Sequence, residues 1–264
     1  MRIPIFHVDA FAEKPFEGNP AAVCLLGEER PEGWMQSVAA EMNLSATAFI
    51  RPVDRGYELR WFTPTVEIAL CGHATLASAH VMWTENVAGR SGPIRFHTKS
   101  GILKCNQAGE IIELNFPATS PIETVPESGL LDALRVRPCF AGKSKFDDFL
   151  VVESEEIVRS LKPDFQALRS IPGMRGVIVT STSQDPRYDF VSRFFAPGVG
   201  IDEDPVTGSA HCSLAPFWSE RLGKSAMTAF QASKRGGIVR VRVESDRAVL
   251  GGKATSVLRG ELAA

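Results

Sequence analysis

The sequence lacks the features that mark several classes of protein. Its five cysteines are odd in number and form no C-x-x-C pair, which argues against a disulfide framework and indicates a reducing compartment. No uninterrupted apolar run approaches the roughly 18 residues of a membrane helix. Lys and Arg (29) nearly balance Asp and Glu (31), so we expect neither a nucleic-acid partner nor an anionic membrane surface. The first residues carry one early cation, with His7 and Asp9 interrupting the apolar stretch. We therefore expect no secretory signal and a cytoplasmic protein.

Several catalytic and cofactor motifs are also missing. The sequence has no H-E-x-x-H and no G-x-S-x-G string, and the pairs Gly236–Gly237 and Gly251–Gly252 match neither a P-loop nor a dinucleotide fingerprint. His73 and His80 are spaced to share one helix face, but no third ligand type is spaced to join them. We therefore expect no metal.

What the sequence does contain is an internal repeat. Residues 57–68 (YELRWFTPTVEI) and 190–201 (FVSRFFAPGVGI) align at an offset of 133 residues. The five identities are Arg60/Arg193, Phe62/Phe195, Pro64/Pro197, Val66/Val199 and Ile68/Ile201. Downstream the offset slips to 136, where Gly72 matches Gly208 and small residues follow each glycine. The pattern predicts a duplicated unit of strand, proline turn, glycine and helix.

The repeat divides the chain into two α+β halves. Residues 116–128 (FPATSPIETVPES) hold three prolines and are the expected linker, which places the halves at 1–118 and 119–264. We expect the extreme C-terminal strand to pair back onto the first half. Strands are expected at 3–8, 21–26, 47–51, 94–103, 109–115, 149–152, 176–180, 238–243 and 248–252, and helices at 31–42 and near 164–169. Because strands and helices do not alternate strictly, a doubly wound parallel sheet is not expected.

The two glycine-led helix starts are the candidate site. Unpaired N–H groups at a helix N-terminus bind carboxylate or phosphate, and ligand sites favour the interface between related halves. His73 and Asp204 can move protons, while Thr207 and Ser209 can cap a helix or donate to a ligand. Each proton-moving residue has a structural alternative. His73 fits an ordinary first-turn position, and Asp204 fits a helix N-cap before Pro205.

Four longer strings resemble the PhzF-like isomerases of phenazine biosynthesis. They are VDAFAEKPFEGNPAAV, EMNLS-x-TAF, FTPTVEIALCGHATLASAH and FFAPGVGIDEDPVTGSAH, and they occur in the family's order. The resemblance implies a duplicated diaminopimelate-epimerase-like fold, in which each half has a curved, mostly antiparallel sheet around a central helix. It also implies cofactor-independent isomerisation of a small carboxylate-bearing metabolite by proton transfer at carbon, in a homodimer.

The resemblance also implies roles for individual residues. Gly72 and His73 match the family's Gly-His, Asp204 its second-half aspartate, and Gly208 and Ser209 its Gly-Ser. The implied catalytic positions are Ala46, His73 and Asp204, and the implied substrate-binding residues are Gly72, Ser45, Thr207, Gly208 and Ser209.

The sequence departs from the family at its principal acid/base. The family's string S-E-T-A-F reads Ser45-Ala46-Thr47-Ala48-Phe49 here. A methyl group cannot carry a proton, and such groups contribute about 10²–10⁴-fold to rate, so we expect low activity. Three explanations stay open: a substitution introduced to trap a bound substrate, a relative that binds a metabolite without turnover, or a different residue that performs the proton transfer.

For the last explanation, the offset of 133 pairs Cys71 with Asp204, a thiol with a carboxylate. Related two-thiol epimerases place their acid/base groups symmetrically in this way, so a thiol-dependent epimerase is an alternative. Glu41 lies one helical turn upstream of Ser45, where we expect a solvated helix surface.

Overall fold

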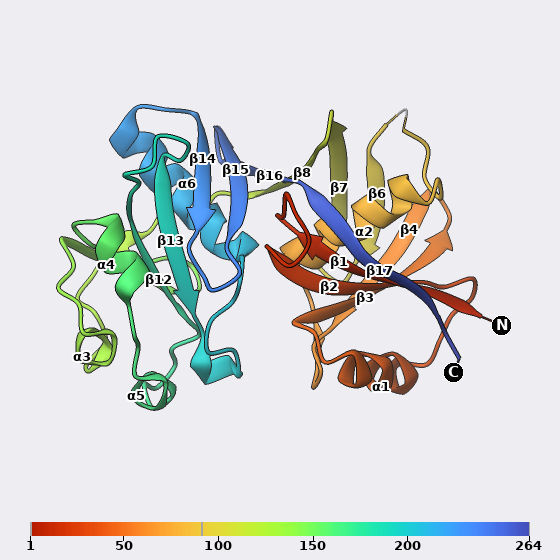
Figure 1. Ribbon diagram of the computed structural model, residues 1–264, viewed down its shortest axis with the longest axis horizontal. Helices are drawn as coiled ribbons and strands as arrows, with labels where there is room; N and C mark the ends of the chain where they lie inside the picture. Colours follow the sequence, from red (N-terminus) through yellow and green to blue (C-terminus); the bar gives the residue numbers. More distant parts are fainter. Residues whose placement is uncertain (1, 91, 264) are drawn as a thin grey trace. The chain divides into compact units, whose positions relative to one another are not determined.

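A computed structural model describes residues 2–90 and 92–263 (Figure 1). The chain forms two compact units, Met1–Asn115 together with Gly251–Ala264, and Phe116–Leu250. It passes from one unit to the other within strands β8 (Ile111–Pro117) and β16 (Arg247–Gly252). The proline-rich stretch that follows the first passage holds only the short strand β9 (Ile122–Glu123).

The first unit is a mixed sheet with a buried helix. Its strands, in spatial order, are β17 (Ala254–Leu262), β1 (Ile3–Ala10), β2 (Asn19–Leu25), β3 (Ala46–Val53), β4 (Gly56–Phe62), β6 (Ile94–Thr98), β7 (Gly101–Ala108) and β8. The short β5 (Glu67–Ile68) pairs with the end of β4. Because β17 pairs antiparallel with β1, the C-terminal segment belongs to this unit.

Two helices complete the first unit. In α2 (Gly72–Thr84), 10 of 13 residues are buried, on every side of the helix, as is typical of a helix enclosed by its own domain. The helix α1 (Glu32–Met42) instead has one buried stripe, whose Met35 and Val38 join Ala22 and Phe49 in an apolar cluster.

The second unit is also a mixed sheet. Its strands, in spatial order, are β9, β10 (Phe140–Lys143), β11 (Asp148–Val151), β12 (Val177–Thr182), β13 (Phe190–Phe195), β14 (Ala226–Gln231) and β15 (Gly237–Glu244). Its helices are α3 (Leu130–Leu134), α4 (Glu155–Ser160), α5 (Phe165–Arg169), the 3-10 turn η1 (Pro197–Val199) and α6 (Gly208–Leu222). Most of α6 is buried, as in α2.

The two units repeat one pattern of strand pairing. The strands β1-β2-β3-β4-β6-β7 pair as antiparallel, parallel, antiparallel, parallel and antiparallel, and β10-β11-β12-β13-β14-β15 pair in the same order. In each unit the buried helix follows the fourth strand of the series, α2 after β4 and α6 after β13 (Figure 1). The duplicated α+β fold predicted from the repeat is therefore confirmed.

The repeated arginines explain part of the sequence repeat. Arg60 Nε and Nη2 donate to the two carboxylate oxygens of Glu67 at 2.8 and 2.7 Å, and Arg193 donates in the same way to Glu203 at 2.6 and 3.0 Å. Each guanidinium also lies over the aromatic ring two residues further along its strand, 5.2 and 4.8 Å from the ring centroid. Each ion pair ties a strand to the segment that leads to the buried helix.

Several elements differ from the sequence-based expectations. The expected strand 94–103 is wrong, because a turn after Thr98 divides it into β6 and β7, so there are two hairpins where one was expected. Thr98 Oγ1 accepts from Ser100 N at 3.1 Å, and Gly101 follows with φ +101°. The helices α3 and α4 and the strands β9, β10 and β14 lie outside the expected elements.

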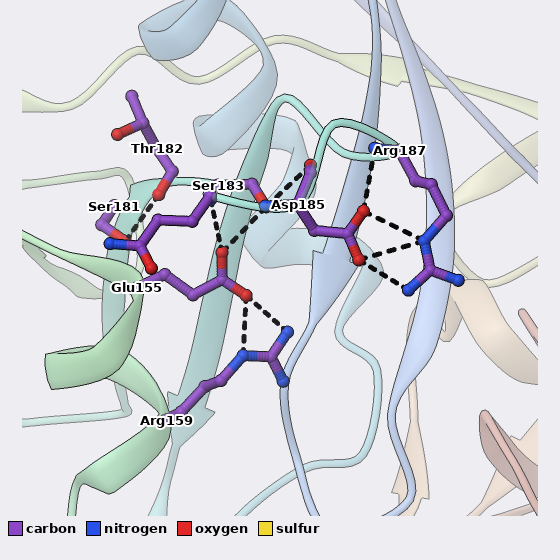
Figure 2. Close-up of polar contacts among 8 residues, drawn as sticks. Glu155, Arg159, Ser181, Thr182, Ser183, Asp185 and Arg187 are labelled. Carbon is purple, nitrogen blue, oxygen red and sulfur yellow. Dashed lines mark hydrogen bonds and ion pairs between the residues drawn. The ribbon is translucent and has the colours of Figure 1, made fainter.

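Glu155, the first residue of α4, holds the segment that follows β12 (Figure 2). Its carboxylate accepts from Arg159 Nε at 2.7 Å, Ser183 Oγ at 2.9 Å and Gln184 N at 2.6 Å. Burial raises the pKa of Glu155, but these hydrogen bonds outweigh burial, and the net shift is downward. These contacts tie the first turn of α4 to the segment that follows β12.

Candidate active site

The candidate residues form two groups, one in each unit. Ser45, Ala46, Gly72 and His73 lie in the first unit, around the start of α2. Asp204, Thr207, Gly208 and Ser209 lie in the second unit, around the start of α6.

The first group is joined by the hydroxyl of Ser45. Its Oγ lies 2.8 Å from Asn19 Oδ1, 2.9 Å from the Pro20 carbonyl and 3.2 Å from His73 Nε2. Asn19 is fully buried and directly follows Gly18, whose φ is +65°. A Cβ at Gly18 would lie 2.1 Å from the Ala10 carbonyl oxygen, so this turn requires glycine.

His73 is the second residue of α2 and is almost completely buried. Burial lowers its pKa to about 4, so the ring is neutral at pH 7 and has one donor and one acceptor nitrogen. Cys71 Sγ lies 3.5 Å from Nδ1. We assign the proton to Nε2, which then donates to Ser45 Oγ, while Nδ1 accepts from the Cys71 thiol. With this assignment, the Ser45 hydroxyl donates its proton to Asn19 Oδ1 or to the Pro20 carbonyl.

Ala46 begins β3 and is fully buried. Successive side chains of a strand point to opposite faces, and Phe49 shares its cluster with residues of α1. Ala46 and Ala48 therefore point to the other face, where α2 packs on β3. The side chain at position 46 thus lies on the face of the sheet that packs on α2, directly after Ser45. Glu41 is exposed on α1, as expected.

The second group is organised by a glutamine that the sequence did not indicate. Gln231, on β14, accepts from Thr207 N at 2.8 Å and donates to the Asp204 carbonyl at 2.8 Å. The Asp204 carboxylate accepts from Thr207 Oγ1 at 2.6 Å. The alternative that Asp204 caps the helix before Pro205 is wrong, because Thr207 is the residue that precedes α6.

The two helix starts share one hydrogen-bond pattern. The fourth residue of each helix donates to the carbonyl of the residue before that helix: Thr75 Oγ1 to Cys71 at 2.5 Å, and His211 Nδ1 to Thr207 at 2.8 Å. Cys71 and Thr207 are therefore equivalent. The expected equivalence of Cys71 with Asp204 is wrong, because the repeat gains three residues before the second helix.

His211 and Arg175 are further residues that the sequence did not indicate. His211 is fully buried, and its pKa is lowered to about 4 by burial, opposed by the hydrogen bond to the Thr207 carbonyl. Since a carbonyl only accepts, His211 carries its proton on Nδ1. Arg175 Nη2 donates to Ser209 Oγ at 3.2 Å, at the second residue of α6.

The described residues form neither a metal site nor a membrane-spanning helix. Within residues 2–90 and 92–263, no three His, Cys, Asp or Glu side chains are grouped so that they could hold a metal ion. Over the same residues, no helix has the length and apolar character needed to cross a membrane.

The duplicated fold, with a buried helix that starts beside a histidine in one unit and beside an aspartate in the other, defines a diaminopimelate-epimerase-like isomerase scaffold. A hydroxyproline epimerase from Agrobacterium vitis shares the fold, with a TM-score of 0.61 at 12% identity over 99% of this chain and 92% of that chain.

Comparison with known sequences places the scaffold in one family. The family model described as "Phenazine biosynthesis-like protein" matches residues 8–260, and the chain belongs to this PhzC-PhzF family. An uncharacterized isomerase of Halalkalibacterium halodurans is 51% identical over 263 residues, 99% of each chain. A PhzF-family protein of Enterococcus faecalis has a solved structure with a TM-score of 0.95, at 41% identity over 100% of both chains.

Proposed function

We propose that this protein is a cofactor-independent isomerase scaffold for a small carboxylate-bearing metabolite, with low activity because Ala46 replaces the family's acid/base glutamate. One observation carries the proposal. His73 and Asp204 are present and held by hydrogen bonds, whereas position 46, on the face of the sheet that packs on α2, carries only a methyl group. We also propose a homodimer in the cytoplasm, by analogy with the family.

The remaining residues support proton transfer and carboxylate binding. Neutral His73 has one donor and one acceptor nitrogen, so it can take or return a proton. The Asp204 carboxylate is oriented by Thr207. The first N–H groups of α6, at Gly208 and Ser209, have no acceptor within the helix and suit a carboxylate.

The test restores the missing group. Ala46→Glu should create deuterium uptake from heavy water into members of a panel of cyclic amino and hydroxy acids, followed by mass spectrometry. Adding His73→Ala or Asp204→Asn to this variant should remove the gain. If no panel member gains deuterium with a folded Ala46→Glu variant, the proposal is contradicted.

A second candidate function is metabolite binding without turnover, which the same methyl group at position 46 favours. It predicts that carboxylate ligands raise the melting temperature of the unaltered protein and are recovered unchanged. Conversion of such a ligand by the unaltered protein would exclude this function.

A third candidate is a thiol-dependent epimerase, favoured by the 3.5 Å contact of Cys71 Sγ with His73 Nδ1. It predicts that Cys71→Ser abolishes exchange and that Ala46→Glu adds little. The pairing of Cys71 with Asp204 at equivalent positions no longer supports this candidate, because the hydrogen bonds at the two helix starts make Thr207 the counterpart of Cys71.

A further inference from the structure

Arg175 is held rigidly beside the start of α6. Its Nε and Nη2 both donate to the carboxylate of Asp147, whose side chain is 1% exposed. The guanidinium also lies 5.2 Å from the ring centroid of Phe146 and 5.7 Å from that of Phe194. A guanidinium fixed by a bidentate carboxylate and two rings loses little further entropy when it makes another hydrogen bond.

That further hydrogen bond goes to Ser209, a residue of the proposed carboxylate site. Nη2 lies 3.2 Å from Ser209 Oγ. Arginine can only donate, so Ser209 Oγ must accept, and the hydroxyl proton of Ser209 is directed elsewhere. Ser209 is the second residue of α6, where its own backbone N–H also has no acceptor within the helix. The hydroxyl and the N–H can therefore donate to the same ligand.

The cation adds a second effect. Nη1 of Arg175 has no hydrogen-bond acceptor among the described residues, and the side chain is 39% exposed. A charged donor therefore stands next to the positive end of α6, which favours an anion over a neutral group.

We propose that Arg175 is a positioning residue for carboxylate recognition, which holds Ser209 as a donor to the substrate and is itself held by Asp147. This inference rests on the proposed function, since it concerns the same carboxylate site. Arg175 would thereby make the site bind a carboxylate more tightly than the corresponding amide.

The experiment measures binding, by calorimetry, of L-pipecolate and salicylate and of their carboxamides, which lack the carboxylate charge. The variants are Arg175→Gln, Arg175→Lys, Ser209→Ala and the double variant Arg175→Gln with Ser209→Ala. Arg187→Gln is the matched control, because Arg187 also pairs bidentately with an aspartate, Asp185, of the same unit. Melting temperatures show whether each variant is folded, and Arg175→Lys keeps a cation for the buried Asp147.

We expect Arg175→Gln to weaken carboxylate binding about tenfold and to leave carboxamide binding unchanged. Arg175→Lys should also weaken carboxylate binding, because a single ammonium cannot hold Asp147 and Ser209 in the same fork geometry. The double variant should bind carboxylates more weakly than Ser209→Ala alone, but by less than the full effect of Arg175→Gln, since Arg175 acts partly through Ser209 and partly by its own charge. Arg187→Gln should bind as the unaltered protein does.

Three results would overturn the inference: equal loss of carboxylate and carboxamide binding, a full additional loss in the double variant, or no carboxylate binding by the unaltered protein. One further result would distinguish the inference about Arg175 from the proposed isomerase function. Arg175-dependent carboxylate binding, in a protein where Ala46→Glu produces no exchange, would support the inference and contradict the isomerase.

Discussion

Ser45 Oγ lies 3.2 Å from His73 Nε2, which joins the residue before β3 to the first turn of α2. The contact places a hydrogen-bonded imidazole beside Ser45, the residue that precedes position 46. Ser45 thereby has two functions, because its hydroxyl also contacts Asn19 and Pro20 in the preceding turn.

Ser45→Ala should lower the free energy of unfolding by about 1–3 kcal/mol, because it leaves buried polar groups of His73 and Asn19 without this partner. Urea denaturation measures the change. Ser37→Ala is the control, since Ser37 is an exposed residue whose hydroxyl bonds only its own helix, at Gly33. Its effect should stay within about 0.5 kcal/mol. Equal effects of the two substitutions would contradict the role given to Ser45.

Stability should fall as the pH falls from about 6.5 to 4. Burial lowers the pKa of His211 to about 4, below the ordinary value of 6.5 that it regains on unfolding. Between these two values the unfolded chain binds the additional proton, so acid favours unfolding, and the contribution is complete above pH 6.5. A shift of this size corresponds to about 3 kcal/mol.

His211→Asn isolates this contribution. An asparagine does not titrate, and its amide can donate to the Thr207 carbonyl in place of Nδ1. Denaturation at pH 7 and at pH 4.5 should therefore show a smaller loss of stability for His211→Asn than for the unaltered protein. The prediction fails if the two proteins lose the same free energy over this range.

Gly18→Ala should destabilise the first unit by more than about 2 kcal/mol. The new Cβ would lie 2.1 Å from a carbonyl oxygen, at a residue whose φ is +65°. Gly33→Ala is the matched control, because a Cβ there meets nothing within 4 Å and Gly33 lies in α1. It should be neutral or stabilise by up to about 1 kcal/mol. Thermal unfolding should show a lower melting temperature for Gly18→Ala and an unchanged or higher one for Gly33→Ala.

The two repeated arginines should differ in importance. Arg193→Met should cost about 3–5 kcal/mol, since Arg193 pairs with Glu203 and also donates to the carbonyls of Val158 and Leu161. Arg60→Met should cost clearly less, because the Arg60 side chain is more exposed and Lys99 still neutralises Glu67. Chemical denaturation of the two variants gives the comparison, and an equal or reversed order would contradict it.

More of the fold than of the candidate site could be predicted from the sequence. The repeat of arginine, aromatic and proline residues indicated the duplication, and the structure confirms it through two identical series of strand pairings. The repeat did not reveal that β6 and β7 are separate strands, because they lie outside the aligned residues and the apolar residues of 94–103 alternate only weakly across the turn.

The site was predictable where its residues are neighbours in the chain, as in the glycine-led starts of α2 and α6. Gln231 and Arg175 could not be predicted, because they are distant in the chain from the residues they contact. Gln231 reaches Thr207 from β14, and Arg175 reaches Ser209 from the segment before β12. No local pattern marks such contacts. The prediction that Cys71 and Asp204 are equivalent was wrong, because the segments before the two helices differ in length.

Deuterium exchange by Ala46→Glu, compared with Ala46→Gln, shows whether position 46 lacks only the group that moves the proton. Both side chains have the same shape and enter the same buried position, but only the carboxyl group of glutamate can take up and return a proton. We predict that Ala46→Glu exchanges deuterium into a cyclic carboxylate at least about 100-fold faster than the unaltered protein, while Ala46→Gln gives no gain. Equal exchange by the two variants, or rapid exchange by the unaltered protein, would contradict the claim that position 46 lacks the group that moves the proton.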